Sequence, residues 1–254
     1  MNAFRWLRGM GKLLRGCGWI LASIVIPACH PLPTPEPAVK NQPQGQVSPE
    51  TWIDRLGHRN PLVQRRAVEE LVALGESVVP KVTPLLEKKT AGAARCGAAQ
   101  VLGRLGTKAE SAIPALLESL NDREWPDREM AAEALGLIGR QAAQVIPALI
   151  TALKEDPDER VRAKAAKSLG RFASQAGTDS KAAIQALRGA MKDSDLQVQM
   201  AAAGALGCFG PRAQAAIAEL KAAAQSEHFV LRQAAEESLK AITPTGSPTQ
   251  TAIP

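Results

Sequence analysis

The chain has 254 residues, of which 45% are hydrophobic and only 3% aromatic, and it contains no tyrosine. A core with so few rings must be built from alanine, leucine, valine and isoleucine. This favours closely packed helices over a β-sandwich or barrel and argues against an aromatic stacking platform for single-stranded nucleic acid. The formal net charge is +6, of which +4 lies in residues 1–47 and +2 in the rest. Because most of the chain is nearly neutral, we expect no nucleic-acid partner.

Residues 1–28 predict a signal peptide. Four basic residues precede an uncharged run from Cys17 to Ala28, which is shorter than the ~20 residues that span a bilayer and typical of a secretory signal. The run ends in Ile26-Pro27-Ala28-Cys29, which resembles a bacterial lipobox, so Cys29 is predicted to be lipidated. We expect a bacterial protein that is exported and either membrane-anchored or periplasmic. Pro27 departs from the small residue usual at its place, which leaves another export signal, an uncleaved anchor and a cytoplasmic amphipathic start as alternatives.

Residues 29–49 predict a proline-rich tether. Six prolines lie between residues 30 and 49, with no aromatic residue. Such a stretch cannot form a core and favours polyproline II, at ~3 Å per residue. The tail, residues 244–254, is predicted to be disordered.

Residues 50–243 contain one unit repeated six times. Six alanines recur at intervals of 31 to 37 residues, each followed four places on by leucine and seven places on by an apolar residue. These offsets lie on one face of an α-helix, so the pattern predicts six amphipathic helices in one register. The pairs are Ala67 and Leu71, Ala98 and Leu102, Ala131 and Leu135, Ala165 and Leu169, Ala202 and Leu206, and Ala235 and Leu239.

A second, shorter helix is predicted after each of these. The first helix closes near a Leu-Gly pair, where glycine supplies a left-handed cap. A proline often opens the next helix in its first turn, as in AIPALLESL and VIPALITAL, where it removes no intrahelical hydrogen bond. An acidic turn then leads to the next repeat. Asp122, Asp156 and Asp193 lie in these turns, and six residues after each of them comes Arg128, Arg162 or Gln199, respectively.

This pattern resembles the short bacterial HEAT-like repeat of phycobilin lyase subunits, most fully in DPDERVRAKAAKSLGRF, residues 156–172. The resemblance implies an all-α fold, an α-solenoid of about six stacked two-helix repeats that bury their apolar faces against one another. It implies that the alanine-leucine helices line the concave side. It also implies a ladder of Asp and Arg charge pairs, broken in four repeats by His58, Lys89, Gln199 and Ser226.

Motifs for catalysis are absent from the sequence. There is no CxxC, phosphate loop or nucleophile elbow, and no His-Glu dipeptide such as the iron-binding deoxyhypusine hydroxylases of this repeat fold carry. We therefore predict no enzyme activity, catalytic residue, metal or cofactor. Cys96 and Cys208 lie three repeats apart, about 30 Å at the usual helix spacing, too far for a disulfide.

The surface that points away from the alanine column is the candidate binding surface. Arg160, Lys164, Lys167 and Arg171 stand one helical turn apart and predict a basic ridge in repeat four, beside an acidic band in repeat three. We predict that a protein partner binds the concave face of a monomer through Lys164, Lys167, Arg171, Arg104, Glu129 and Glu133.

The sequence thus predicts a non-enzymatic protein-binding or scaffolding protein, tethered to a membrane through its N-terminus. One alternative is a chaperone or accessory subunit of an enzyme like the phycobilin lyases, which the resemblance implies. A nucleic-acid-binding repeat protein is disfavoured by the small net charge of residues 50–243.

Overall fold

The computed structural model describes residues 47–174 and 179–243. These residues form α-helices and 3₁₀ turns, and no strand occurs among them. The predicted signal peptide, Cys29, most of the tether and the tail lie outside the described residues.

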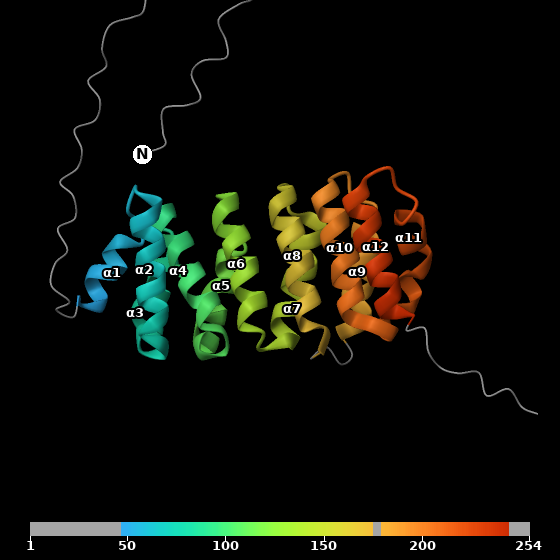
Figure 1. Ribbon diagram of the computed structural model, residues 1–254. Helices are drawn as coiled ribbons and strands as arrows, with labels where there is room; N and C mark the ends of the chain where they lie inside the picture. Colours follow the sequence, from blue (N-terminus) through green and yellow to red (C-terminus); the bar gives the residue numbers. More distant parts are fainter. Residues whose placement is uncertain (1–46, 175–178, 244–254) are drawn as a thin grey trace, which may run out of the picture. The chain divides into compact units, whose positions relative to one another are not determined.

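Six helices with the alanine-leucine pattern stand side by side as an inner layer (Figure 1). All six alanines and the first five leucines are fully buried, whereas Leu239 in the last helix is only partly buried. The predicted register is therefore confirmed. The inner helices are α2 (Pro61–Ala73), α4 (Gly92–Leu105), α6 (Trp125–Ile138), α8 (Glu159–Arg171), α10 (Leu196–Phe209) and α12 (Phe229–Ile242).

An outer layer of shorter elements packs against them. Each outer helix makes its most extensive contact with the inner helix that follows it, giving the hairpins α1–α2, α3–α4, α5–α6, α7–α8, α9–α10 and α11–α12. The six predicted repeats are present, but the sequence had attached each shorter helix to the inner helix before it. The outer elements are α1 (Pro49–Arg55), η1 (Gly75–Val78), α3 (Val79–Val82), η2 (Thr83–Leu86), η3 (Gly106–Ala112), α5 (Ile113–Ser119), α7 (Ala142–Glu155), η4 (Phe172–Ser174), α9 (Asp179–Ala190), η5 (Gly210–Ala216) and α11 (Ile217–Ala223).

The expected helix ends are only partly right. The predicted left-handed glycine follows four of the inner helices, at Gly75, Gly106, Gly139 and Gly210. Pro147, however, does not open its helix: α7 begins five residues earlier, so the proline lies inside it. The corresponding stretch before α5 and before α11 is a 3₁₀ turn.

Small residues set the spacing of the inner layer. A glycine stands five places after the alanine in four consecutive repeats and faces the next inner helix. A Cβ on Gly136 would lie 2.4 Å from the Ser168 Oγ, and one on Gly207 would lie 2.7 Å from the Ser238 Oγ. Both serines are buried and donate hydrogen bonds to backbone carbonyls of the preceding inner helix. Side chains larger than these could not fit between the helices.

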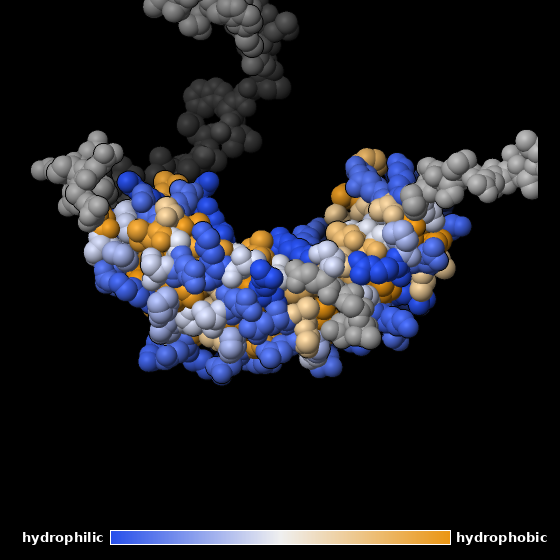
Figure 2. Space-filling view, turned by 90° about the horizontal axis from the view of Figure 1, so that it is seen from below, coloured by the Kyte–Doolittle hydropathy of each residue, from blue (hydrophilic) through white to orange (hydrophobic). Residues whose placement is uncertain are grey.

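The outer layer is spread more widely than the inner one. Between α5 and α7 lies an open cleft of about 600 Å³, floored by Leu117, Leu120 and Ala148. Because the hairpins are closer together on the inner side, their row bends toward the inner helices. Figure 2, which looks along the helices, shows the resulting arc of the repeat unit with one hollowed face. The inner helices thus line the concave side, as predicted.

A ladder of ion pairs joins successive turns. Arg128 binds Asp156 at 2.7 and 2.8 Å, and Arg162 binds Asp193 at 2.9 Å through both of its contacts. Each arginine also donates to backbone carbonyls of its own turn. One rung of the ladder thus fixes a turn and ties it to the next repeat.

The predicted break in repeat two is wrong. Arg95 forms a rung with Asp127 and reaches Asp122 at 3.9 Å. Because the partner of each arginine lies in the following repeat, Lys89 in the preceding turn does not interrupt the ladder. Asp127 occupies a position that is apolar in the other repeats, and its burial is explained by this pair.

Candidate partner-binding surface

The predicted acidic and basic bands partly neutralise each other. The Lys164 Nζ lies 3.0 Å from a Glu133 carboxylate oxygen and 3.5 Å from one of Glu129. The side chain of Lys164 is only 21% exposed. These three predicted residues are brought together as a bridge between α6 and α8, so the two bands are reduced to one cluster with a net charge of −1.

The predicted basic ridge is also interrupted at its first member. Arg160 is held by Asp158 at 2.7 and 2.9 Å, and its guanidinium lies 3.3 Å from the ring centre of Trp125. A cation on an aromatic face is a stable arrangement. Asp158 also accepts a hydrogen bond from the Arg160 backbone amide as the cap of α8. Arg160 therefore serves the fold locally.

The other three predicted residues remain exposed on the inner helices. Arg104 on α4 and Lys167 and Arg171 on α8 have exposed side chains. No ion pair to any of them occurs among the described residues. They are the members of the predicted set whose charge is available to a partner.

A shallow groove adjoins them on the concave face. It has a volume of about 210 Å³ and runs over α8, α10 and α12. Lys167 and Glu237 stand on its two flanks, and Met200, Ala201 and Val230 supply apolar surface between them. Val230 is 50% exposed, although it is apolar. Val230 is not among the residues that the sequence predicted for the partner-binding surface.

The carboxylates with a lowered pKa among the described residues are all held by a nearby cation: Glu50 by Lys81, Asp158 by Arg160, Asp193 of the ladder by Arg162, and Glu219 by Arg188. The hydrogen bond from Arg162 is the main cause that lowers the pKa of Asp193, against the opposing effect of burial. The same hydrogen bond, donated to Asp193, raises the pKa of the Arg162 guanidinium. Shifted values can mark a catalytic site, but structural ion-pair networks produce them too. Here the partner of each group is already in place, which gives the shift a structural cause.

Cys96 is a half-buried thiol with a structural contact. Burial, followed by the charge and hydrogen bond of Asp127, raises the pKa of Cys96 to about 12. The Sγ donates to a carboxylate oxygen of Asp127 at 3.3 Å. A thiol held protonated is a poor nucleophile. Neither Cys96 nor Cys208 forms a disulfide, and Cys208 lies exposed on α10.

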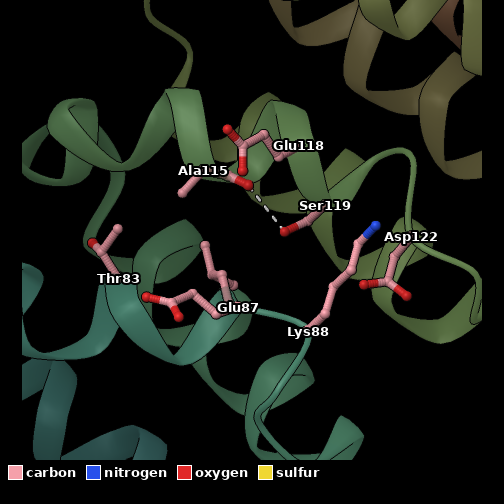
Figure 3. A pocket seen from close by; sticks show the side chains of 8 residues that line it. Thr83, Glu87, Lys88, Ala115, Glu118, Ser119 and Asp122 are labelled. Carbon is pink, nitrogen blue, oxygen red and sulfur yellow. Dashed lines mark hydrogen bonds between the residues drawn. The ribbon is translucent and has the colours of Figure 1, made fainter.

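A small hollow of about 80 Å³ lies between η2 and α5 (Figure 3). Glu87 and Lys88 on one side face Glu118, Ser119 and Asp122 on the other. The hydroxyl of Ser119 donates to the carbonyl of Ala115 in its own helix at 3.0 Å. Neither histidine of the described residues lines the hollow, and the hydroxyl of Ser119 is donated to a backbone carbonyl rather than to one of the carboxylates around it.

Two further kinds of site were sought in the part of the chain that the structure describes. There, three or more His, Cys, Asp or Glu residues do not come together in a metal-binding arrangement. Nor does that part contain a helix long and apolar enough to cross a membrane.

A row of stacked hairpins with a hollow inner face defines the class of the protein, an α-solenoid. The family model for HEAT repeats matches residues 49–136, 113–179 and 146–240. The chain belongs to the HEAT repeat family.

Solved structures share this fold at low sequence identity. A designed armadillo repeat protein in complex with the peptide (KR)4 is 17% identical, with a TM-score of 0.55, and the alignment covers 77% of this chain and 99% of that one. The complex of CpcE and CpcF of phycocyanin lyase from Nostoc is 22% identical, with a TM-score of 0.53 and coverage of 84% and 82%. The karyopherin Kap121p, bound to the extreme C-terminus of the protein phosphatase Cdc14p, is 18% identical with a TM-score of 0.61, over 76% of this chain and 23% of that one. No curated protein matches the chain by sequence.

Proposed function

We propose that the protein is a non-enzymatic scaffold that binds a protein partner on its concave face. The observation that carries this proposal is the combination of an open groove with exposed, unpaired cations on the inner helices. Two structures with the same fold, the designed armadillo protein and Kap121p, are complexes with a peptide or a protein segment. Extended concave surfaces are the usual binding surfaces of solenoids.

Site-specific crosslinking tests the proposal. A photoreactive benzoylphenylalanine placed at Gly204 would project into the concave face, because a Cβ there meets nothing within 4 Å. The same group at Lys221, exposed on the outer helix α11, is the matched control. We expect a discrete protein adduct from Gly204 and none from Lys221. Equal labelling from both positions, or none from Gly204, would contradict the proposal.

A second candidate function is that of a chaperone-like or accessory subunit related to the lyases. The specific observation in its favour is the structural likeness to the complex of CpcE and CpcF. Bilin transfer to a phycobiliprotein subunit, measured by absorbance with and without this protein, would test it. An increase in the rate of attachment would support this role over that of a passive scaffold.

We further propose that the protein is exported in a bacterium and anchored through a lipidated Cys29. The support is the lipobox-like sequence, which lies outside the described residues. Labelling with an alkyne palmitate should mark the wild type and not Cys29→Ala, and only the wild type should partition into detergent. Equal partition of both proteins without label would point to one of the other kinds of N-terminus.

The scaffold is proposed to be a monomer. The last inner helix carries an exposed lysine, Lys240, at the position where the preceding four have glycine. The first inner helix carries Glu70 three places after its alanine, where the later inner helices have a small or apolar residue on the side toward the preceding inner helix. Polar end repeats stop further stacking. Sedimentation should therefore give a monomer mass over the micromolar range.

A further inference from the structure

One row of side chains crosses the concave face at the same position in successive inner helices. The row consists of the residues six places after the repeat alanine. On α4, α6, α8 and α10 these are Arg104, Leu137, Arg171 and Cys208, and all four are exposed. Leu137, between the two arginines, is 39% exposed although it is apolar. We call Arg104, Leu137 and Arg171 the Arg-Leu-Arg row.

The charges of this row differ from the other charges on the inner helices. Arg65 is engaged by Glu69 at 3.2 Å within α2, and Lys164 is engaged by the two glutamates of α6. Within the described residues, neither Arg104 nor Arg171 has such a partner. Lys164 offsets one of the two carboxylates of α6, which leaves a charge of −1 there. Arg104, Arg171 and Lys167, which stands one turn from Arg171, outweigh it, so the net charge at the centre of the concave face is positive.

The spacing of the row sets the size of a ligand. Arg104 and Arg171 are separated by two inner helix spacings, or about 16–20 Å at the usual 8–10 Å per helix pair. An extended peptide advances about 3.3 Å per residue. Successive side chains of an extended chain point to opposite faces, so two carboxylates face the protein together only when they lie an even number of places apart. Six places span about 20 Å, which joins Arg104 to Arg171, and a residue two or four places after the first carboxylate faces the same side, close to Leu137.

We propose that the concave face binds an extended acidic segment of a partner protein, with two carboxylates six places apart and an apolar side chain between them on the same face of the segment. The two carboxylates pair with Arg104 and Arg171, since arginine offers a planar pair of donors for carboxylate oxygens. The apolar side chain covers Leu137 and removes it from water. This assignment rests on the proposed function and specifies the chemistry of its partner.

A peptide explains the row better than other anionic partners do. A flat membrane surface cannot enter a hollow face. A nucleic acid would place a phosphate at every nucleotide, whereas the row offers two separated cations with an exposed leucine between them. Nucleic-acid binding normally needs a continuous basic surface.

Fluorescence anisotropy with defined peptides tests the assignment. The probe is a labelled peptide with two glutamates six places apart and leucines two and four places after the first glutamate, so that all four side chains share one face when the peptide is extended. The comparison peptides have glutamine in place of glutamate, or the same residues with the two glutamates adjacent. The protein variants are the wild type, Arg104→Glu with Arg171→Glu, and a control with the same change in net charge, Lys181→Glu with Lys221→Glu. Both control lysines are exposed on outer helices.

The expected result is saturable binding of the spaced glutamate peptide to the full-length wild type. The double arginine variant should bind it at least tenfold more weakly, and a peptide with arginines in place of the glutamates should bind that variant better than the wild type. The control variant should stay within twofold of the wild type. All variants should keep the wild-type unfolding temperature, because the substituted side chains are exposed.

Four outcomes would overturn the assignment. They are failure of the wild type to bind at millimolar peptide, equal weakening by the control variant, no preference for the spaced peptide, and tighter binding of a duplex or an anionic vesicle than of the peptide. The proposed function is judged separately by crosslinking at Gly204. A crosslinked partner that still binds the double arginine variant would remove the acidic-segment assignment and leave the scaffold role standing.

Discussion

The close contact between α6 and α8 makes Gly136 the position where a single methyl group should do most harm. In Gly136→Ala, the new Cβ would lie 2.4 Å from the Oγ of Ser168 and 2.9 Å from its Cα. Ser168 cannot turn away at no cost, because its hydroxyl donates to the carbonyl of Ala132 at 2.7 Å in a fully buried place. The two helices must therefore separate, by about 1 Å, in a densely packed layer.

The magnitude follows from two opposing effects. Overpacking of a close-packed interior costs about 1–3 kcal/mol. Alanine in place of glycine within a helix returns about 1 kcal/mol. We expect Gly136→Ala to lower the free energy of unfolding by up to about 2 kcal/mol, and the unfolding temperature by up to about 8 °C for a chain of this size.

Gly204 provides the matched control. It also lies inside an inner helix, but a Cβ there meets nothing within 4 Å. Gly204→Ala should therefore raise the free energy of unfolding by about 1 kcal/mol through helix propensity alone. Urea unfolding followed by circular dichroism measures both variants. In addition, Ser168→Gly should be less harmful in the Gly136→Ala background than in the wild type. Equal stability of the two alanine variants would refute the role assigned to the glycine column.

Three further predictions concern single side chains. Asp193→Asn should destabilise the protein at pH 7 by about 1–3 kcal/mol, since a charged hydrogen bond to Arg162 is lost. The pKa of Asp193 is lowered in the folded protein, so its contribution to stability is present above the unfolded pKa of about 3.9 and is lost as the pH falls through the folded value. The urea midpoints at pH 7 and pH 3 should therefore differ less for Asp193→Asn than for the wild type. Lys164→Glu should lower the unfolding temperature, because it places a third carboxylate beside Glu129 and Glu133. Its control, Lys167→Glu, should change the free energy of unfolding by less than about 0.5 kcal/mol. Equal effects of the two variants would contradict the bridge. Cys96 should resist alkylation at pH 8 in the folded protein, while the exposed thiol of α10 reacts. Peptide mapping of the alkylated protein would show this difference. Fast labelling of Cys96 would contradict its partial burial and raised pKa.

The fold could be predicted from sequence because burial on one face of a helix leaves a regular trace. Ala131 and Leu135, for example, have equivalents in all six repeats, and such columns report on contacts that every repeat must make. The same columns cannot tell which neighbour a shorter helix prefers. In the sequence, each shorter helix lies between two inner helices, and its apolar pattern is the same whichever of the two it packs against. Grouping it with the inner helix before it was therefore wrong.

The candidate surface was harder to predict because it depends on contacts between repeats. Lys164 was assigned to a free ridge because only its own helix was considered, where no acid offsets it. Glu129 and Glu133 stand at nearly the same height on the adjacent helix, and aligning the repeats side by side would have revealed the bridge. The glycine column was visible in the same way, since Gly136 has an equivalent five places after the alanine in three other repeats.

The rows that face neighbouring repeats and the rows that face solvent obey different constraints. A side chain between two inner helices must be small, as Gly136 is, or must be paired, as Lys164 is, because the next repeat stands against it. On the concave face, Arg104 and Arg171 have no ion-pair partner among the described residues, so the fold does not require their charge. Leu137 lies beside Gly103 of the adjacent helix, yet its side chain is still 39% exposed. Exposed charges add little stability, and unpaired like charges on one hollow surface repel each other. Arg104 and Arg171, with an exposed Leu137 between them, therefore gain nothing for the solenoid by standing in one row. The fold gives no reason for this row, whereas a partner that neutralises the two cations and covers the leucine does.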